Sequence, residues 1–155
     1  MKYSVIIPYY DSPELRFSLD SYAHYYGSRK DTEIIIVEAS ENYFSEGLHA
    51  QLLSIIGKYK DAIDIQTIID PIKGKSLPNK YLLGAKVATG DFIMLTTSYT
   101  VPDFDFFEKI KNEILDNTCI VCGCAGVRLS EDRGTFFNSD FCFEHWYQHS
   151  QQVNR

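Results

Sequence analysis

Residues 90–102 read Gly-Asp-Phe-Ile-Met-Leu-Thr-Thr-Ser-Tyr-Thr-Val-Pro, a short apolar run that ends in hydroxyl side chains and a proline. An apolar run of this length after a glycine predicts a buried strand. In open α/β sheets, ligands bind beyond the carboxyl ends of the strands. We therefore expect the hydroxyl residues that follow this strand to lie at the ligand site.

Predicted strands and helices alternate on both sides of this stretch. Ser12 is expected to cap a helix with Pro13 at its first position, Gly27 to end that helix, and Ala39–Asn42 to form a polar turn. The remaining pattern predicts strands at Tyr3–Pro8, Glu33–Glu38, Ile63–Ile69 and 118–127, and helices at 12–26, 48–59, Asn79–Ala88 and 102–115. This alternation predicts an α/β fold with a mainly parallel central sheet flanked by helices.

Length and charge indicate one globular domain without a nucleic-acid partner. The 155 residues are 45% hydrophobic and 23% charged, which fits one domain over residues 1–155. The 21 acidic and 15 basic residues give a net charge of -6 without a Lys/Arg cluster, so the electrostatic footprint of nucleic-acid binding is missing. Met1–Pro8 is too short for a signal peptide, and no later run could span a bilayer. We therefore expect a cytoplasmic protein, with peripheral attachment to a membrane left open.

Three of the four cysteines, Cys119, Cys122 and Cys124, lie close together, and the fourth is Cys142. This spacing is compatible with a thiolate metal cluster, but only one cysteine lies outside the run, and Ile, Val and Ala surround it. The pattern favours small buried thiols in a strand. Disulfides are not expected in a cytosolic protein.

Three segments together resemble glycosyltransferase family 2. Val5–Asp11 resembles the family's opening, an apolar strand followed by Pro, any residue, Tyr and Asn, and Glu33–Ser40 resembles its Glu-Ile-Ile-Val-Asp-Asp-Gly-Ser. Gly84, Ala88 and Gly90–Ile93 match its Asn-x-Gly-x-x-x-Ala-x-Gly-Glu-Tyr-Ile segment. The order and spacing agree over about two-thirds of the chain. The resemblance implies a three-layer, Rossmann-like GT-A domain that binds a nucleotide sugar and is short on the acceptor side.

The resemblance also implies a set of donor-binding residues. Tyr10 matches the aromatic residue that packs on the donor base, and Glu38 matches an acid that accepts hydrogen bonds from the base or ribose. Pro8 and Ser40 occupy matching motif positions, whereas Ala39 replaces the second acid of the pair. The alternatives are that Tyr10 is an ordinary loop tyrosine and that Glu38 ends a strand in solvent.

The largest departure from the family lies at the strand quoted first. Where the family has Asp-x-Asp, which holds a divalent cation against the donor diphosphate, this chain has Thr97, Ser98 and Tyr99. Hydroxyls can bind phosphate but are poor ligands for Mg²⁺ or Mn²⁺. Thr97 and Tyr99 are therefore donor-binding candidates, and no residue is assigned to a metal. The nearby acids Asp103 and Asp105 fit the first turn of a helix better than a metal site.

Basic residues offer a substitute for the missing cation. Lys75, together with Lys73 and Lys80, lies in a stretch rich in turn residues, and Arg128 and Arg133 follow later. These side chains are able to meet a diphosphate directly. The alternative is that they are solvated surface lysines and arginines.

The catalytic candidates lie near the carboxyl terminus. Residues 140–146 resemble the family's late acidic motif, an aromatic residue followed by Glu-Asp, whose carboxylate acts as general base on the acceptor hydroxyl. The resemblance implies this role for Glu144, or for His145 at the family's Asp position. The alternative is an amphipathic terminal helix whose aromatic side chains pack on the sheet.

Two functions follow from these predictions. The first is an enzyme that moves a sugar from a UDP- or GDP-sugar to a saccharide or glycolipid acceptor, in polysaccharide or glycoconjugate synthesis. The second is an inactive glycosyltransferase-like module for binding or assembly. The missing Asp-x-Asp favours the module, and the motif residues Pro8, Tyr10 and Glu144 favour the enzyme. The short acceptor side is compatible with a homo-oligomer or a partner chain.

Overall fold

The computed structural model describes residues 1–73, 76–102, 106–108 and 111. The chain divides into two compact units, Met1–Val101 and Pro102–Arg155, and the helices and strands named below belong to the first. The strand predicted around the clustered cysteines and most of the helix predicted over 102–115 lie outside the described residues. The single domain predicted for residues 1–155 stays a prediction.

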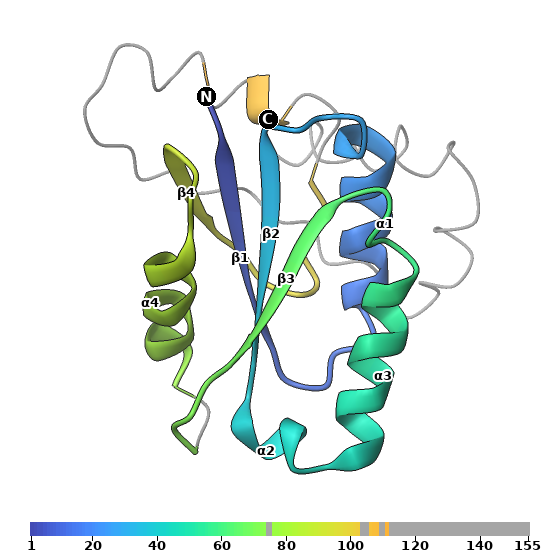
Figure 1. Ribbon diagram of the computed structural model, residues 1–155, viewed down its shortest axis with the longest axis vertical. Coiled ribbons are helices and arrows are strands. Elements are labelled where there is room, and N and C mark those ends of the chain that lie inside the picture. The colour runs from blue at the N-terminus through green and yellow to red at the C-terminus, as the bar shows by residue number, and fades with distance from the viewer. Residues whose placement is uncertain (74–75, 103–105, 109–110, 112–155) are drawn as a thin grey trace, which may run out of the picture. The chain divides into compact units, whose positions relative to one another are not determined.

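The described strands form one parallel sheet. It contains β1 (Tyr3–Tyr9), β2 (Thr32–Glu38), β3 (Asp64–Ile69) and β4 (Phe92–Leu95) in the order β3-β2-β1-β4 (Figure 1). Each neighbouring pair runs parallel, with Tyr9 opposite Glu38 and Ile6 opposite Leu95. The carboxyl ends of all described strands therefore lie at the same edge of the sheet.

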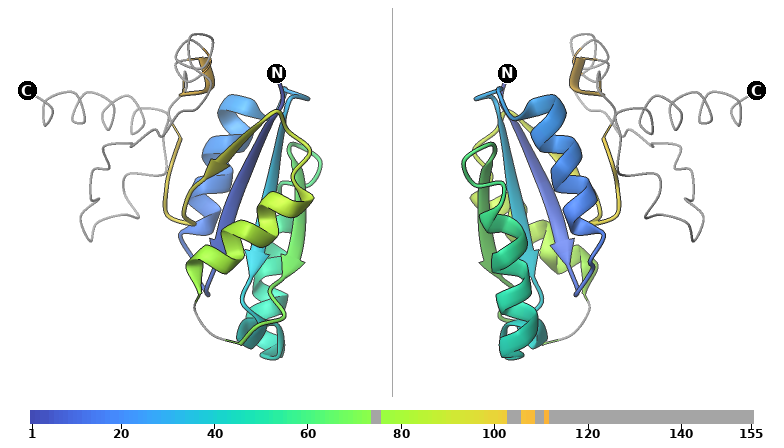
Figure 2. Two further views of the ribbon diagram at one scale, coloured as in Figure 1. Left: turned by 90° about the vertical axis from the view of Figure 1, so that its left-hand side faces the viewer. Right: turned by 90° about the vertical axis from the view of Figure 1, so that its right-hand side faces the viewer.

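Helices cover both faces of this sheet. The helices α1 (Leu15–Tyr26) and α3 (Glu46–Gly57) lie on one face, and α4 (Leu77–Val87) lies on the other (Figure 2). The predicted three-layer α/β architecture is confirmed. In the described part of the chain, no helix has both the length and the apolar character needed to cross a bilayer.

The core lies around the two central strands. Every residue of β1 and β2 is buried, because helices cover both faces and the strands need no polar side. On one face Leu15, Leu19, Tyr22 and Tyr26 of α1 are buried, as their helical spacing predicts. On the other, the buried cluster of Ile6, Ile35 and Val37 packs against Ile68, Tyr81, Leu83, Ala85 and Ala88.

The start of α1 differs from the prediction. The helix begins at Leu15, two residues after Pro13, and Ser12 does not cap it. The Ser12 hydroxyl instead donates to Glu14 Oε2 at 2.8 Å, while the Ser12 carbonyl accepts from the Leu15 N–H at 3.1 Å. Asp11, which directly precedes Ser12, has φ 60°, a left-handed conformation.

The segment predicted as a polar turn after β2 forms a short helix instead. This is α2 (Ser40–Tyr43), and it follows an extended Ala39 directly. The N–H groups of Asn42 and Tyr43 donate to the Ala39 carbonyl at 3.0 and 3.3 Å. The polar composition of 39–42 was compatible with either conformation, because Ser and Asn favour helix starts as well as turns.

The burial of β4 was also predicted wrongly. Ile93 is 40% exposed and Leu95 is 55% exposed. Among the described strands, β4 pairs only with β1 and therefore lies at an edge. Its apolar sequence predicted the strand correctly, but an apolar run does not indicate whether both faces are covered.

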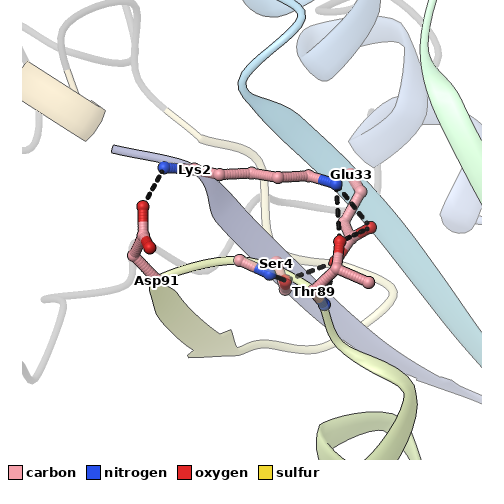
Figure 3. Close-up of polar contacts among 6 residues, drawn as sticks. Lys2, Ser4, Glu33, Thr89 and Asp91 are labelled. Carbon is pink, nitrogen blue, oxygen red and sulfur yellow. Dashed lines mark hydrogen bonds and ion pairs between the residues drawn. The ribbon is translucent and has the colours of Figure 1, made fainter.

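A polar network joins the amino-terminal ends of β1 and β2 to the turn between α4 and β4 (Figure 3). The buried carboxylate of Glu33 accepts from Ser4 Oγ at 2.5 Å, from the Thr89 N–H at 2.7 Å, from Thr89 Oγ1 at 2.8 Å and from Lys2 Nζ at 3.1 Å. Burial alone would raise the pKa of Glu33, but these hydrogen bonds outweigh it and lower the pKa to about 2.

Two glycines allow the crossover from α4 to β4 to pack closely. A Cβ on Gly84 would overlap the side chain of Ile6, so the absence of a side chain lets α4 rest directly on β1. A Cβ on Gly90 would lie 2.6 Å from Ser4 Oγ and 2.9 Å from the Lys2 carbonyl. Instead, the Gly90 N–H donates to Ser4 Oγ at 2.8 Å.

Glu33 is expected to make stability depend on acid pH. Its pKa is about 2 in the folded protein and 4.5 without the network, so its contribution is complete above the unfolded pKa and is lost as pH falls through the folded one. The difference corresponds to about 3 kcal/mol of the free energy of unfolding. Urea unfolding between neutral and strongly acidic pH measures it, with Glu33→Gln losing the steep acid dependence. The exposed Asp61→Asn is the control; equal acid dependence in wild type and Glu33→Gln would contradict the assignment.

Gly84→Ala is expected to destabilise the protein by roughly 1–3 kcal/mol, because the added methyl group overpacks the buried Ile6. The matched control is Gly47→Ala in α3, where nothing lies within 4 Å of the added Cβ. That change should be neutral or stabilising because alanine favours helix. Urea midpoints measure both variants, and equal stability of the two would show that α4 does not rest on β1 through Gly84.

Candidate functional site

The carboxyl ends of β1, β2 and β4 bring most of the described site candidates to one edge of the sheet. Tyr10 follows β1, Glu38 ends β2, and Thr97 follows β4 closely. The ladder between β1 and β4 extends one residue further, because the Thr96 N–H donates to the Ile6 carbonyl at 3.1 Å. This is the edge at which parallel α/β sheets bind ligands.

Glu38 is buried and has one partner that the sequence did not predict. Its side chain is 1% exposed, and Oε2 lies 2.8 Å from Nδ1 of His49 on α3. The other carboxylate oxygen, Oε1, is buried without a hydrogen-bond partner in the described part of the chain. The alternative that Glu38 ends its strand in solvent is therefore wrong. No sequence signal distinguishes His49 from an ordinary helix residue.

Several more buried polar atoms lie unpaired near Glu38. Glu38 Oε1, Ser40 Oγ, Asn42 Nδ2 and the Tyr10 hydroxyl are buried and have no hydrogen-bond partner in the described part of the chain. These atoms belong to residues that end β2 or follow β1 and β2 within a few positions. An unpaired buried polar group costs roughly 1–3 kcal/mol. A cluster of them at a ligand-binding edge indicates a site that a bound molecule completes.

Lys80 lies beneath the aromatic ring of Tyr10. Its Nζ is 4.6 Å from the ring centroid, and the side chain is fully buried. The sequence predicted Lys80 to act with the loop lysines, either on a diphosphate or in solvent. Both expectations are wrong for this residue, because it belongs to α4 and is fully buried against the Tyr10 ring. A cation against the ring attracts the π electrons and holds the ring in place.

Asp70 pairs with Lys80 and joins the end of β3 to the start of α4. It accepts from Lys80 Nζ at 2.9 Å, from Asn79 Nδ2 at 2.9 Å and from the Ile72 N–H at 3.0 Å. Burial would raise the pKa of Asp70, but its hydrogen bonds outweigh burial and lower it. Burial would lower the pKa of Lys80, but Asp70 and Tyr10 outweigh it and raise it. The two side chains therefore form a buried, fully charged pair.

Tyr81 of α4 connects this helix to the residue that directly follows β4. Its hydroxyl donates to the Thr96 carbonyl at 2.8 Å. Burial raises the pKa of Tyr81, and the nearby phenols of Tyr99 and Tyr10 raise it further. Tyr10 and Tyr99, two of the predicted donor-binding residues, therefore both lie near Tyr81.

The residues at the family's Asp-x-Asp position form a hydroxyl-rich turn. Thr97 Oγ1 lies 2.7 Å from Thr100 Oγ1, and the Thr100 N–H donates to the Thr97 carbonyl at 3.2 Å. Ser98 is buried, whereas Tyr99 is 69% exposed. This turn does not fit a divalent cation, because it offers no carboxylate and its threonine hydroxyls bind each other. No group of three or more His, Cys, Asp or Glu able to hold a metal occurs in the described ranges.

Pro8 is another of the predicted donor-binding residues that the structure describes. Pro8 is buried in β1 opposite Val37, beyond the last β1 residue that pairs with β4. A proline is tolerated there because that side of the strand has no ladder to interrupt. The roles of the site candidates stay predictions. Those outside the described residues are Lys75, Glu144, His145, Asp103, Asp105, Arg128, Arg133 and the cysteines.

Solved glycosyltransferase structures share this fold. S. aureus TarS 1-349 matches with a TM-score of 0.60 and 20% identity over 75% of this chain and 33% of its own. The same protein in complex with UDP-GlcNAc matches with 0.60 and 21% over 75% and 32%. The mannosyltransferase PcManGT from Pyrobaculum calidifontis, in complex with GDP-Man and Mn²⁺, matches with 0.54 and 19% over 67% and 29%. At these identities the likeness establishes the fold, which is the predicted GT-A fold.

The chain spans about a third of the length of these solved structures. A comparison with curated protein sequences gives no significant match. The sequence profile described as Glycosyl transferase family 2, however, matches residues 4–155. Because that match covers nearly the whole sequence, the chain belongs to glycosyl transferase family 2.

Proposed function

We propose that this chain binds a nucleoside-diphosphate sugar at the carboxyl edge of its sheet and transfers the sugar to an acceptor hydroxyl. The observation that carries the proposal is the cluster of unpaired buried polar atoms on Tyr10, Glu38, Ser40 and Asn42. A nucleoside carries hydrogen-bonding groups on its base and ribose, which is the kind of ligand that satisfies several protein donors and acceptors together.

In this proposal the base stacks on Tyr10, while Glu38 and its neighbours bind the polar edges of the nucleoside. Stacking needs a ring whose orientation is fixed, and Lys80 under Tyr10 supplies that restraint. The known ligands of the structural neighbours support a nucleotide sugar, because TarS binds UDP and UDP-GlcNAc and PcManGT binds GDP-Man. The donor of this chain is proposed to be a UDP- or GDP-sugar.

The chemical step uses residues outside the described ranges. Glu144 or His145 takes the proton from the acceptor hydroxyl, whose oxygen attacks the anomeric carbon of the sugar. The bond from that carbon to the diphosphate oxygen breaks, and the nucleoside diphosphate leaves with the bonding electron pair. We assign stabilisation of the leaving diphosphate to Lys73, Lys75 and the later arginines. No step is assigned to a metal, because the Thr97–Tyr99 turn does not fit one.

A second candidate function is a non-catalytic binding or assembly module. The specific observation in its favour is the turn itself, where Thr97 binds Thr100 and no carboxylate is present. Such a module would keep the nucleotide-binding edge and lose transfer. Transfer activity therefore separates the two candidates, whereas nucleotide binding alone does not.

The acceptor, the oligomeric state and the cellular process are further parts of this proposal. A saccharide or glycolipid is the proposed acceptor, and a second copy or a partner chain is proposed to help bind it. A glycolipid acceptor fits a cytoplasmic protein that attaches to the membrane surface. Polysaccharide or glycoconjugate synthesis is the process proposed.

Nucleotide binding is expected to need the Tyr10 ring and not a divalent cation. In calorimetric titrations of the full chain with UDP and GDP, at least one should bind, and EDTA or added Mn²⁺ should leave its Kd unchanged. Tyr10→Ala should weaken binding by about 1–3 kcal/mol, the value of one stacked base. Tyr10→Phe is the matched control and should retain most of the affinity, because it keeps the ring.

If neither nucleotide nor its sugar binds, with or without Mn²⁺, the proposed function is wrong. Binding that strictly requires Mn²⁺ would instead establish a metal site and contradict the metal-independent account of the diphosphate. Thermal unfolding of each variant separates a lost contact from a lost fold, because a ligand raises the apparent stability only of a folded protein that binds it.

Replacing Glu144 or His145 is expected to lower transfer without weakening donor binding. General-base catalysis typically contributes 10²–10⁴-fold, so Glu144→Gln or His145→Gln should reduce turnover by about that factor while the Kd for the nucleotide stays unchanged. Release of nucleoside diphosphate from a UDP- or GDP-sugar with saccharide acceptors measures turnover. Wild-type turnover in both variants would remove these residues from the mechanism, and absence of transfer in the wild type with all donors would favour the module.

A further inference from the structure

The outer edge of β3 lies on the opposite side of the sheet from β4 (Figure 1), and in the described part of the chain β3 pairs only with β2. We infer that this edge binds a second copy of the chain, with the two β3 strands antiparallel and in a register centred on Thr67. The inference assigns a surface to the second copy named under the proposed function. It does not depend on nucleotide binding, because dimerisation through β3 requires no ligand.

The sequence of β3 lacks the features by which exposed strand edges usually avoid pairing. Such edges are short, carry lysine or proline, or are interrupted by a bulge. β3 reads Asp-Ile-Gln-Thr-Ile-Ile over six residues and pairs with β2 residue for residue from Asp64 to Ile69. Its charged residue, Asp64, stands at the first position, whereas β4 at the other edge is four residues long. Of the two described edges, β3 is therefore better suited to add a strand.

The hydrogen bonds to β2 determine which backbone groups of β3 point outward. The Asp70 N–H donates to the Glu38 carbonyl at 2.9 Å, so the backbone groups of Asp70 face β2. The direction of the N–H and C=O groups alternates from one residue to the next along a strand. The groups that point away from β2 therefore belong to Ile65, Thr67 and Ile69.

These three outward residues are self-complementary about a two-fold axis at Thr67. Thr67 then lies opposite its own copy, and Ile65 and Ile69 each lie opposite the other residue in the second copy. Opposite residues of this type exchange both of their N–H···O=C bonds in an antiparallel pair. A shift by one residue would place outward groups opposite groups that already bind β2. A shift by two residues would leave fewer pairs, so the register at Thr67 satisfies the most backbone groups.

The side chains of the same three residues also match across this axis. Ile68 lies opposite Val37 of β2, and both pack on the α4 side of the sheet. Ile65, Thr67 and Ile69 alternate with Ile68 and therefore share the other face. Thr67 and Ile69 are exposed, and Ile65 is half-buried. The pairing sets isoleucine opposite isoleucine and threonine opposite threonine, which are cross-strand pairs that stabilise a sheet.

The pairing has defined ends and a defined orientation. One position further out, Asp64 would face Asp70 of the second copy, and like charges directly opposite each other are unfavourable. The paired segment therefore ends at Ile65 and Ile69. Because the two strands run antiparallel, the carboxyl edges of the two sheets point in opposite directions. Each copy then keeps its own ligand edge, and dimerisation should leave the affinity for a nucleotide unchanged.

Sedimentation velocity of the full chain over the micromolar range tests this interface, and the wild type should form a dimer. Thr67→Lys should raise the dimer dissociation constant about tenfold or more, because it sets two like charges against each other at the axis. Thr67→Pro should have the same effect because it removes an outward N–H, while an exposed strand edge tolerates proline. The matched control is Leu95→Lys on the other edge strand, where the side chain is 55% exposed. This variant should dimerise like the wild type.

A mixing experiment tests the position of the axis. Thr67→Lys and Thr67→Glu should each be monomeric alone, and an equimolar mixture of the two should form a dimer, because only the mixture sets lysine opposite glutamate. Only an interface in which residue 67 faces its own copy gives this recovery. Thermal unfolding of each variant identifies those that remain folded, and the oligomeric states are compared among these.

Several outcomes would overturn the inference. A wild type that stays monomeric throughout the range is one, and a dimer that persists in folded Thr67→Lys and Thr67→Pro is another. Loss of the dimer in both charged variants without recovery in the mixture would remove the axis from Thr67 and with it the proposed register. Failure of the wild type to bind any nucleotide would contradict the proposed function alone, because the dimer is measured without ligand.

Discussion

The in-register parallel pairing of β1 with β2 is the constraint on which the rest of this structure depends. The two strands are buried along their whole length and end together at Tyr9 and Glu38. Parallel strands require a crossover helix and cover on both faces, so the pairing explains the helices on each side of the sheet. It also brings the loops that follow the strands to one edge. Tyr10 and Glu38 are far apart in sequence, and the pairing makes them neighbours.

Each end of β2 carries a buried glutamate, and the two glutamates differ in how fully their carboxylates are hydrogen-bonded. At the amino end, Glu33 receives hydrogen bonds on both oxygens, and its pKa falls to about 2. At the carboxyl end, Glu38 keeps one oxygen unpaired although it is as deeply buried. A fully paired carboxylate stabilises the fold, whereas an unpaired one costs free energy unless a ligand completes it. The contrast within one strand separates the structural end of the sheet from the end at which we propose that the ligand binds.

Local patterns predicted the frame of the molecule but not its polar contacts. The β-branched runs predicted the strands, because strands that are buried on both faces are almost entirely apolar. The helical spacing of apolar residues predicted the buried face of α1. The motif positions placed Tyr10 and Glu38 at the candidate site. His49 and Asp70 went unpredicted, and Lys80 was assigned wrongly, because their partners lie on other elements and pairing across a fold leaves no periodic signal. The exposure of Leu95 was missed for a related reason, since a strand's sequence does not reveal which strands lie beside it.

The buried pair of Asp70 and Lys80 bears on how a diphosphate is held. Lys80 Nζ is committed to Asp70 and to the Tyr10 ring, and its side chain has no exposed surface. Moving it to a phosphate would leave the Asp70 carboxylate buried without its cation, which is strongly unfavourable. Thr97 can offer little, because its hydroxyl already binds Thr100. In the proposed complex, the charge of the diphosphate therefore has to be met by side chains that are exposed and not already paired. Among the described lysines near this edge, the exposed Lys73 in the loop between β3 and α4 meets that condition.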